Sequence, residues 1–318
     1  MNKKALIPFV MLFLAIVFPF ITPNPSFWIT NGGSRTLWIG LIALSMVFMN
    51  KNLGLMSLGQ LFFCGISGYT IAILTISHSI NYGISIPLGI IFGTFAGVII
   101  GWIALKAEAV YFLMLTLAVA LGLYSLTQQA ETITHGHTGI NAVAIPRPFG
   151  INFDNPKTFY YACLLINVAF YATCKFLEKT SFGLALNGIR DDSARTAALG
   201  YNNNVLKLIA FTFAAFISSV AGVIGLFYYQ AISPDSVGLV RSIDLLVVVV
   251  VGGASYLSGS YVGAAVIAIF ENLIQDYTQY YVGATGLLFI LILLIAPQGL
   301  MGVGLQLNSR RKRATENV

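Results

Sequence analysis

EKTSFGLALNGIRDDSARTAALGYNNNVLK occupies residues 178–207 and interrupts a chain that is otherwise strongly apolar. Counted from Lys175 to Lys207 with both ends included, this region holds five of the seventeen basic residues and three of the eleven acidic residues. The sequence on either side of it is suited to lipid. We therefore expect a loop at about residues 177–205 to be the place where this protein meets something soluble.

One segment of the loop has the signals of a short helix. Ser193 to Leu199 suits a helix, and Gly200 suits its end. Either acid just before it can cap its start. A helix across the cytoplasmic mouth of a membrane bundle offers a docking surface; a solvated connecting loop is the alternative. Charge partners and small residues for such docking are Arg190, Asp191, Asp192, Arg195, Ala197 and Ala198.

Composition places the chain in a membrane. It has 318 residues, of which 57% are hydrophobic and only 9% charged, whereas soluble domains carry roughly 25% charged residues. Each charge-free interval holds a stretch near the ~20 residues that cross ~30 Å of hydrocarbon as a helix. The lack of strict alternation argues against a β-barrel. The predicted fold class is all-α, a polytopic transmembrane helical bundle. The charge-free intervals are 52–105, 109–130, 208–234, 245–270 and 277–309.

We expect about ten spans, with about eight as the lower limit. The first apolar run follows Lys3 and Lys4 and resembles a signal peptide, but a small-residue cleavage pattern is missing, so a retained span is preferred. Glycines interrupt the region 240–274, which could instead form one long or re-entrant segment. The expected spans are 5–22, 36–50, 60–77, 84–105, 109–130, 158–176, 206–229, 240–252, 260–274 and 281–298.

The basic residues predict the orientation. By the positive-inside rule the richer side is cytoplasmic, so both termini and the 177–205 loop are expected inside. The tail, about 303–318, serves as a topology anchor, and the loop from Glu131 to Lys157 is expected to cap the outer face. Of the seventeen basic residues, four fall outside, namely Arg35, Arg147, Lys157 and Arg241. The thirteen inside are Lys3, Lys4, Lys51, Lys106, Lys175, Lys179, Arg190, Arg195, Lys207, Arg310, Arg311, Lys312 and Arg313.

Two glycine patterns stand out within the apolar segments. Gly89, Gly93, Gly97 and Gly101 recur every four residues, which favours tight helix packing over any binding role. The second pattern is KNLGLMSLGQ at 51–60, in which Ser57, Gly59 and Gln60 bring polar groups and flexible backbone to a span. A broken helix that lines a translocation path and an ordinary turn into a helix are both open.

Few residues suggest chemistry. Asp244 and Glu271 lie near predicted span ends, which favours interfacial placement over an ion route. His78, His135 and His137 lack a further ligand partner, so no metal site is expected, and the three cysteines are expected to pack as small hydrophobic groups. The sequence has no phosphate-binding GxxxxGK[ST] loop and no catalytic constellation, so we expect neither catalysis nor a cofactor. The net charge of +6 is explained by topology and predicts no nucleic-acid binding.

Several stretches, in order, resemble the membrane permease subunits of branched-chain amino acid ABC importers, specifically the LivM type. The downstream SPDS and VVVGGASYLSG patterns are the most specific of these motifs. The stretches are LGLMSLGQLFFCGISGYT (53–70), YFLMLTLAVALGLYSLTQQAETITHGHTGINAV (111–143), the run from GIRDDSARTAALGYNNN to YVGAAV (188–266) and IAPQGLMG (295–302).

The resemblance implies one transmembrane permease domain over 1–318 in the bacterial cytoplasmic (inner) membrane. It implies a second, related permease subunit, two cytoplasmic ATPase subunits and an extracytoplasmic substrate-binding protein. The loop helix would then be the coupling helix that docks on an ATPase. Such importers often carry an EAA-x₃-G pattern there, but ARTAAL (194–199) precedes Gly200, so the opening Glu-Ala-Ala is absent.

Other functions remain as alternatives. Related permeases carry urea or short amides, and the spans themselves name no substrate. An ion-coupled secondary transporter would need acidic or broken-helix ion sites at the midplane, and mid-span charge is nearly absent. An integral membrane enzyme would need a catalytic cluster at one interface, and the sequence shows none.

Overall fold

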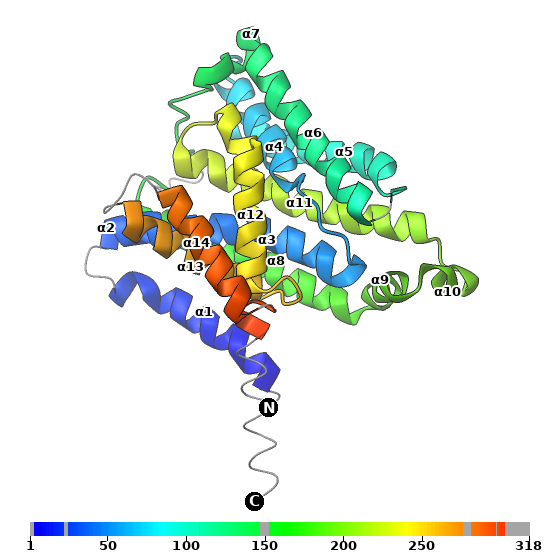
Figure 1. Ribbon diagram of the computed structural model, residues 1–318. Coiled ribbons are helices and arrows are strands. Elements are labelled where there is room, and N and C mark those ends of the chain that lie inside the picture. The colour runs from blue at the N-terminus through cyan, green and yellow to red at the C-terminus, as the bar shows by residue number, and fades with distance from the viewer. Residues whose placement is uncertain are drawn as a thin grey trace, which may run out of the picture.

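The computed structural model describes residues 3–21, 25–107, 109–146, 153–275, 281–296 and 298–302. Within these ranges the chain is helical and has no β-strand; a single antiparallel bridge joins Ile140 and Ile232. The predicted basic tail at about 303–318 lies outside the described residues, as does Arg147. Figure 1 shows long helices stacked across one another, with α9 and α10 projecting at one side.

The helical elements follow the apolar stretches of the sequence closely. They are α1 (Lys3–Ile21), α2 (Pro25–Phe27), the π-helix η1 (Trp28–Ser34), α3 (Arg35–Leu53), α4 (Gln60–Ile76), α5 (Tyr82–Ala104), α6 (Ala109–Gln129), α7 (Glu131–Thr134), the 3₁₀ turn η2 (Gly136–Thr138), α8 (Pro156–Lys179), α9 (Ser181–Asp191), α10 (Ser193–Ala198), α11 (Asn203–Tyr229), the 3₁₀ turn η4 (Pro234–Val237), α12 (Leu239–Gly252), α13 (Gly259–Gln275) and α14 (Tyr281–Ile295).

Among the residues that the structure describes, six segments are long and apolar enough to cross a membrane. Three shorter apolar helices add to them, namely Val10–Phe20, Gln60–Ile76 and Gly259–Gln275. The all-α class and the multi-pass membrane character therefore hold, whereas the expected count of ten spans stays a prediction. The six segments are Trp28–Leu53, Tyr82–Ala104, Val110–Gln129, Pro156–Lys179, Asn203–Tyr229 and Gly283–Gly302.

The four evenly spaced glycines of α5 form a buried stripe against α4 and α11. A Cβ atom added at Gly93 would lie 2.9 Å from the carbonyl oxygen of Phe63 in α4. At Gly101 it would lie 2.6 Å from the ring of Phe211 in α11. Gly89 and Gly97 are buried in the same way. Real Cβ atoms do not approach other atoms this closely, so the absence of side chains lets the backbone of α5 meet the backbone of α4 and the side chains of α11.

Besides several short turns, the structure contains two elements that the sequence did not predict. The loop before α10 folds as a second helix, α9, and the residues before α3 form the π-helix η1. Gly32 and Gly33 of η1 pack against Phe18 of α1. π-helical turns are rare and occur often at functional sites, and here η1 extends α3 at its N-terminal end.

The ambiguous region 240–274 forms two separate helices. α12 ends at Gly252, and a turn with Gly253 at φ +108° leads into α13. Added Cβ atoms at Gly252 and Gly263 would each lie under 3.0 Å from backbone atoms of the facing helix. α12 and α13 are therefore an antiparallel pair in backbone contact, not one long segment.

Candidate functional site

α9 is anchored to the bundle on its apolar side. Ala185, Leu186 and Ile189 are buried, and the spacing of three residues between Leu186 and Ile189 puts both on one helix face. The guanidinium of Arg190 donates a 2.5 Å hydrogen bond to the carbonyl oxygen of Lys51 at the end of α3. Arg190 therefore ties α9 to α3 and is not simply a free docking charge.

α10 is the exposed counterpart of α9. The Asp192 carboxylate caps it by accepting a 3.0 Å hydrogen bond from the backbone N–H of Arg195, and Thr196 is its one buried residue among those the structure describes there. Gly200 ends the turn at φ +89°, a conformation that glycine adopts without strain. Ala197 and Ala198 are exposed.

The exposed surface of α10 contains a residue that the sequence-based prediction omitted. Leu199 has 74% of its surface exposed, beside Arg195 and the two alanines. The structure thus brings Arg195, Ala197, Ala198 and Gly200 together, while Arg190 and Asp191 pair with each other through a 3.0 Å hydrogen bond. The signal for Leu199 in the sequence is an apolar residue at the end of a polar loop helix. This set, Arg195 and residues 197–200, is hereafter the α10 surface.

The polar segment before α4 is non-helical and buried. Residues 55–59 lie between α3 and α4, and Ser57 and Gly59 are both buried. The N–H of Leu58 donates to the Thr116 hydroxyl of α6 at 3.2 Å, and the N–H of Gly59 donates to the Ser57 hydroxyl at 3.2 Å. Buried backbone polar groups need such partners because no lipid can provide them.

This non-helical segment reaches the middle of the bundle. Gln60, the first residue of α4, accepts a 2.7 Å hydrogen bond through Oε1 from the Ser218 hydroxyl. Ser218 lies roughly midway along the 27-residue α11. The Ser45 hydroxyl lies 2.8 Å from the Ser218 hydroxyl. Ser45 itself lies roughly midway along the 19-residue α3. Ser45, Gln60 and Ser218 therefore form a polar cluster at mid-depth, and α4 starts there.

A second segment enters the bundle from the opposite end. After α11 the chain turns back, and Val237 of η4 is buried against Gly65 of α4. Gly238, the last residue before α12, lies beside the ring of Tyr124 in α6. Along α6, Thr116 and Tyr124 are about 12 Å apart at ~1.5 Å per residue. Two helices, α4 and α12, thus begin inside the bundle after backbone that is not α-helical, an arrangement that lines substrate paths in transporters.

An ion pair joins the first residue of α3 to the C-terminal part of α13. The Arg35 guanidinium pairs with the Glu271 carboxylate, and both side chains are about nine-tenths buried. Asn272 accepts a hydrogen bond from Arg35 at 3.4 Å and donates to the backbone of Asn31 at 2.8 Å. The Glu271 side chain is buried within the protein against Arg35, and its interfacial placement in the membrane stays a prediction. Asp244 is half-buried and 4.0 Å from Arg241.

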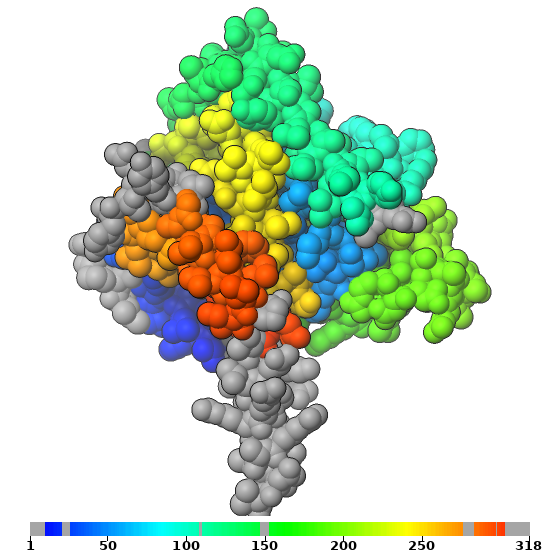
Figure 2. Space-filling view, viewed as in Figure 1, coloured from blue at the N-terminus to red at the C-terminus, as the bar shows by residue number. Residues whose placement is uncertain are grey.

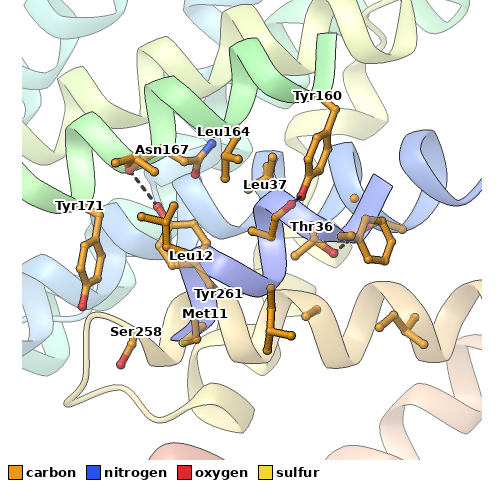
Figure 3. Close-up of a pocket in the computed structure, with 18 residues that line it drawn as sticks. Met11, Leu12, Thr36, Leu37, Tyr160, Leu164, Asn167, Tyr171, Ser258 and Tyr261 are labelled. Carbon is orange, nitrogen blue, oxygen red and sulfur yellow. Dashed lines mark hydrogen bonds between the residues drawn. The ribbon is translucent and has the colours of Figure 1, made fainter. Parts of the chain in front are cut away.

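A large apolar cavity of about 500 Å³ lies between α1, η1, α8 and α13. Figure 3 shows three tyrosines around it, namely Tyr160, Tyr171 and Tyr261, with Asn167 as the one amide among its labelled residues. None of the described residues that line it is charged.

The three cysteines and the histidines form no reactive site in the described part of the chain. Cys64, Cys163 and Cys174 are free and buried. Across those same residues, no group of three or more His, Cys, Asp or Glu side chains is placed to hold a metal ion.

Comparison with known proteins points to one family. The family model "Branched-chain amino acid transport system / permease component" matches residues 29–297. The LivM permease of Salmonella typhimurium is 24% identical over 94% of this chain and 75% of the relative. The ribose import permease RbsC of Haemophilus influenzae is 25% identical over 86% of this chain and 87% of the relative. The LivH permease of Escherichia coli is 26% identical over 59% of this chain and 64% of the relative.

No solved structure matches the chain. The family match nevertheless covers more than half of the sequence and contains both segments of non-helical backbone, the α10 surface and the ion pair. The chain is therefore a member of the branched-chain amino acid permease family, whose members are transport components in the membrane.

Proposed function

We propose that this protein is the permease subunit of an ATP-driven importer of branched-chain amino acids in a bacterial inner membrane. The observation that carries this proposal is the family match over residues 29–297. The LivM relatives, similar over 94% of this chain, are named as parts of a high-affinity branched-chain amino acid transport system. A LivH relative suggests that a second, related permease completes the pore.

We infer that the energy for transport comes from partner subunits and not from this chain. Phosphate-binding loops are absent from the sequence, so we infer that two cytoplasmic ATPase subunits hydrolyse the ATP and that a binding protein delivers the amino acid outside. Ten spans with both termini in the cytoplasm remain our topology, supported by the thirteen basic residues assigned to that side.

The α10 surface is the proposed docking site for an ATPase subunit. An exposed leucine flanked by small residues and one charge is the composition of a compact protein contact, since burial of Leu199 supplies apolar area and the alanines allow close approach. α9 is fixed to α3 through Arg190. A push on α10 is thus transmitted through α9 to the end of α3, next to the non-helical segment 55–59.

An affinity pull-down of the tagged, detergent-solubilised complex tests this proposal. Leu199→Asp should reduce recovery of the ATPase by about fivefold or more, because one desolvated contact residue is worth roughly 1–3 kcal/mol, while the second permease is still recovered. Leu184→Asp is the matched control, since Leu184 is 68% exposed on the anchored α9.

The possible results of this pull-down distinguish docking on α10 from docking on α9 and α10 together, and they also test the importer function. Loss of the ATPase with Leu199→Asp alone assigns docking to α10, and equal loss with both variants assigns it to the pair α9 and α10. If the wild-type complex retains no ATPase under conditions that preserve related importers, the importer function itself is wrong.

A further inference from the structure

A second cavity, of about 330 Å³, lies where α12 begins. Its walls come from α6 (Leu121 and Tyr124), from α13 (Glu271) and from the first turns of α12, which carry Arg241 and Asp244. Figure 2 shows yellow α12 on the visible face of the molecule, between green α6 and orange-red α14. Small-molecule pockets span roughly 300–1,000 Å³, so this volume suits a ligand of few atoms.

The cavity offers both signs of charge to a ligand. Glu271 is occupied by Arg35, but Arg241 and Asp244 are 4.0 Å apart with half and more than a third of their side chains exposed. Asp235, also in the lining, is exposed as well. An ion pair at that distance and exposure is weak, so both groups remain available for stronger contacts.

The position of these charges excludes a lipid-facing role. Gly238 lies beside Tyr124 of α6, inside a helix that qualifies as a membrane span, so α12 starts within the bundle. Ionisable side chains at such depth face protein or a water-filled path, because hydrocarbon cannot solvate them. The neighbouring Val240 has 62% of its surface exposed in the single chain. This face of α12 therefore borders a watery path or the partner permease.

We propose that this cavity is a transient binding site for a zwitterionic amino acid on its way through the membrane. Asp244 and Asp235 face the ammonium group, and Arg241 binds the carboxylate, helped by the uncapped first turn of α12. Leu121 and Tyr124 form the wall for an apolar side chain. This inference rests on the proposed importer function, and it names the substrate class by its charges.

A comparison of the two cavities supports the smaller one as the site for an amino acid. In the larger, apolar cavity an amino acid would lose the hydration of two charges without compensation, which is costly. Urea and short amides carry no charge, so a site for them has no need of Arg241 and Asp244. The opposed charges thus favour an amino acid over the uncharged cargo of related permeases.

Equilibrium binding of radiolabelled leucine to the complete importer in nanodiscs, without the binding protein, tests the site. Competitors are leucinamide, which lacks the carboxylate, and 4-methylpentanoate, which lacks the ammonium group. Loss of one charge-assisted contact corresponds to about tenfold in affinity, so Asp244→Asn and Arg241→Gln should each weaken leucine binding by about that factor. Asp244→Asn should also abolish competition by leucinamide, and Arg241→Gln competition by 4-methylpentanoate.

Glu131→Gln and Lys157→Gln remove exposed charges outside the cavity and are the matched controls; both should bind leucine as the wild type does. ATP-driven leucine uptake by the wild-type complex in proteoliposomes is measured in parallel. If the wild type takes up leucine and both cavity variants bind leucine as tightly as the wild type, the proposed site is wrong but the importer function stands. The same conclusion follows if the wild type takes up leucine but shows no leucine binding. Absence of uptake by the wild type overturns the importer function and the site with it.

Discussion

Two sectors of the bundle are held together in different ways. In the first, α4 meets α5 and α11 at the backbone through glycines, and the only charged residue of these three helices is Lys207. In the second, α3, α12 and α13 also use glycine contacts, but they carry the buried ion pair of Arg35 with Glu271 as well as Arg241 and Asp244. Figure 1 shows the two sectors side by side, with α11 crossing behind α4.

This difference indicates that the first sector is a structural scaffold and that the second sector contains the ligand-binding surfaces. Backbone contact leaves no space for a ligand, and neither of the two cavities described above lies between α4, α5 and α11. The cavities instead border α13, and the smaller one also borders α12. We therefore expect the first sector to move as a rigid body, while changes during transport occur around the second.

The largest effect is expected from a side chain in the first sector. At Gly222 of α11, a Cβ would lie under 3.0 Å from the backbone oxygen of Cys64 in α4. Backbone cannot move aside as a flexible side chain can, so Gly222→Leu should abolish recovery of monodisperse protein. Gly122→Leu, at a glycine with no other atom within 4 Å of an added Cβ, should leave recovery unchanged. Size-exclusion chromatography in detergent measures both, and normal recovery of Gly222→Leu would refute backbone contact between α4 and α11.

How far the sequence could predict this arrangement depends on the range of the interactions. The spans follow from local hydropathy, and α12 at Leu239–Gly252 begins within one residue of the predicted 240–252. α9 could not be predicted, because Gly183 and Gly188 are poor helix formers and its stability comes from packing on the bundle. The pairing of Arg35 with Glu271 joins residues 236 positions apart, and hydropathy carries no information on such a contact.

The candidate sites also differ in whether local sequence or long-range contacts determine them. The α10 surface lies on a polar loop whose charges are visible in the sequence, so its location was predictable while its exposed Leu199 was not singled out. The depth of residues 55–59 depends on Gln60 meeting Ser218 at mid-bundle, which no local pattern encodes. That these residues line a substrate path therefore stays a prediction.

An intermediate effect is expected from the buried ion pair in the second sector. Glu271→Leu leaves the Arg35 charge buried without a partner, which costs roughly 3–5 kcal/mol, whereas replacing both partners by apolar residues is often near neutral. Thermal unfolding in detergent should show a large loss for Glu271→Leu and substantial recovery in the double variant Arg35→Met with Glu271→Leu. Glu178→Gln breaks the more accessible pair with Lys51 and should cost less. Equal losses in the single and double variants would contradict the explanation by an unpaired charge.

The smallest effect is expected where the two sectors meet. The Ser218 hydroxyl of α11 is hydrogen-bonded to Oε1 of Gln60 in α4 at 2.7 Å and to the Ser45 hydroxyl of α3 at 2.8 Å. Ser218→Ala removes both bonds, and interhelical hydrogen bonds in membranes average ~0.6 kcal/mol each, so we expect about 1 kcal/mol of destabilisation. Ser219→Ala is the matched control, because its equally buried hydroxyl donates only within α11, to the carbonyl oxygen of Ala215 at 2.8 Å.

Thermal unfolding of the two serine variants should therefore differ, with the lower midpoint for Ser218→Ala. The argument depends on contact between helices and not on the loss of a hydroxyl group as such, since both substitutions remove one oxygen from a fully buried site. Identical midpoints would mean that the mid-depth cluster does not hold α3, α4 and α11 together. In that case the glycine contacts of the first sector and the ion pair of the second would be independent of each other, joined only by apolar packing.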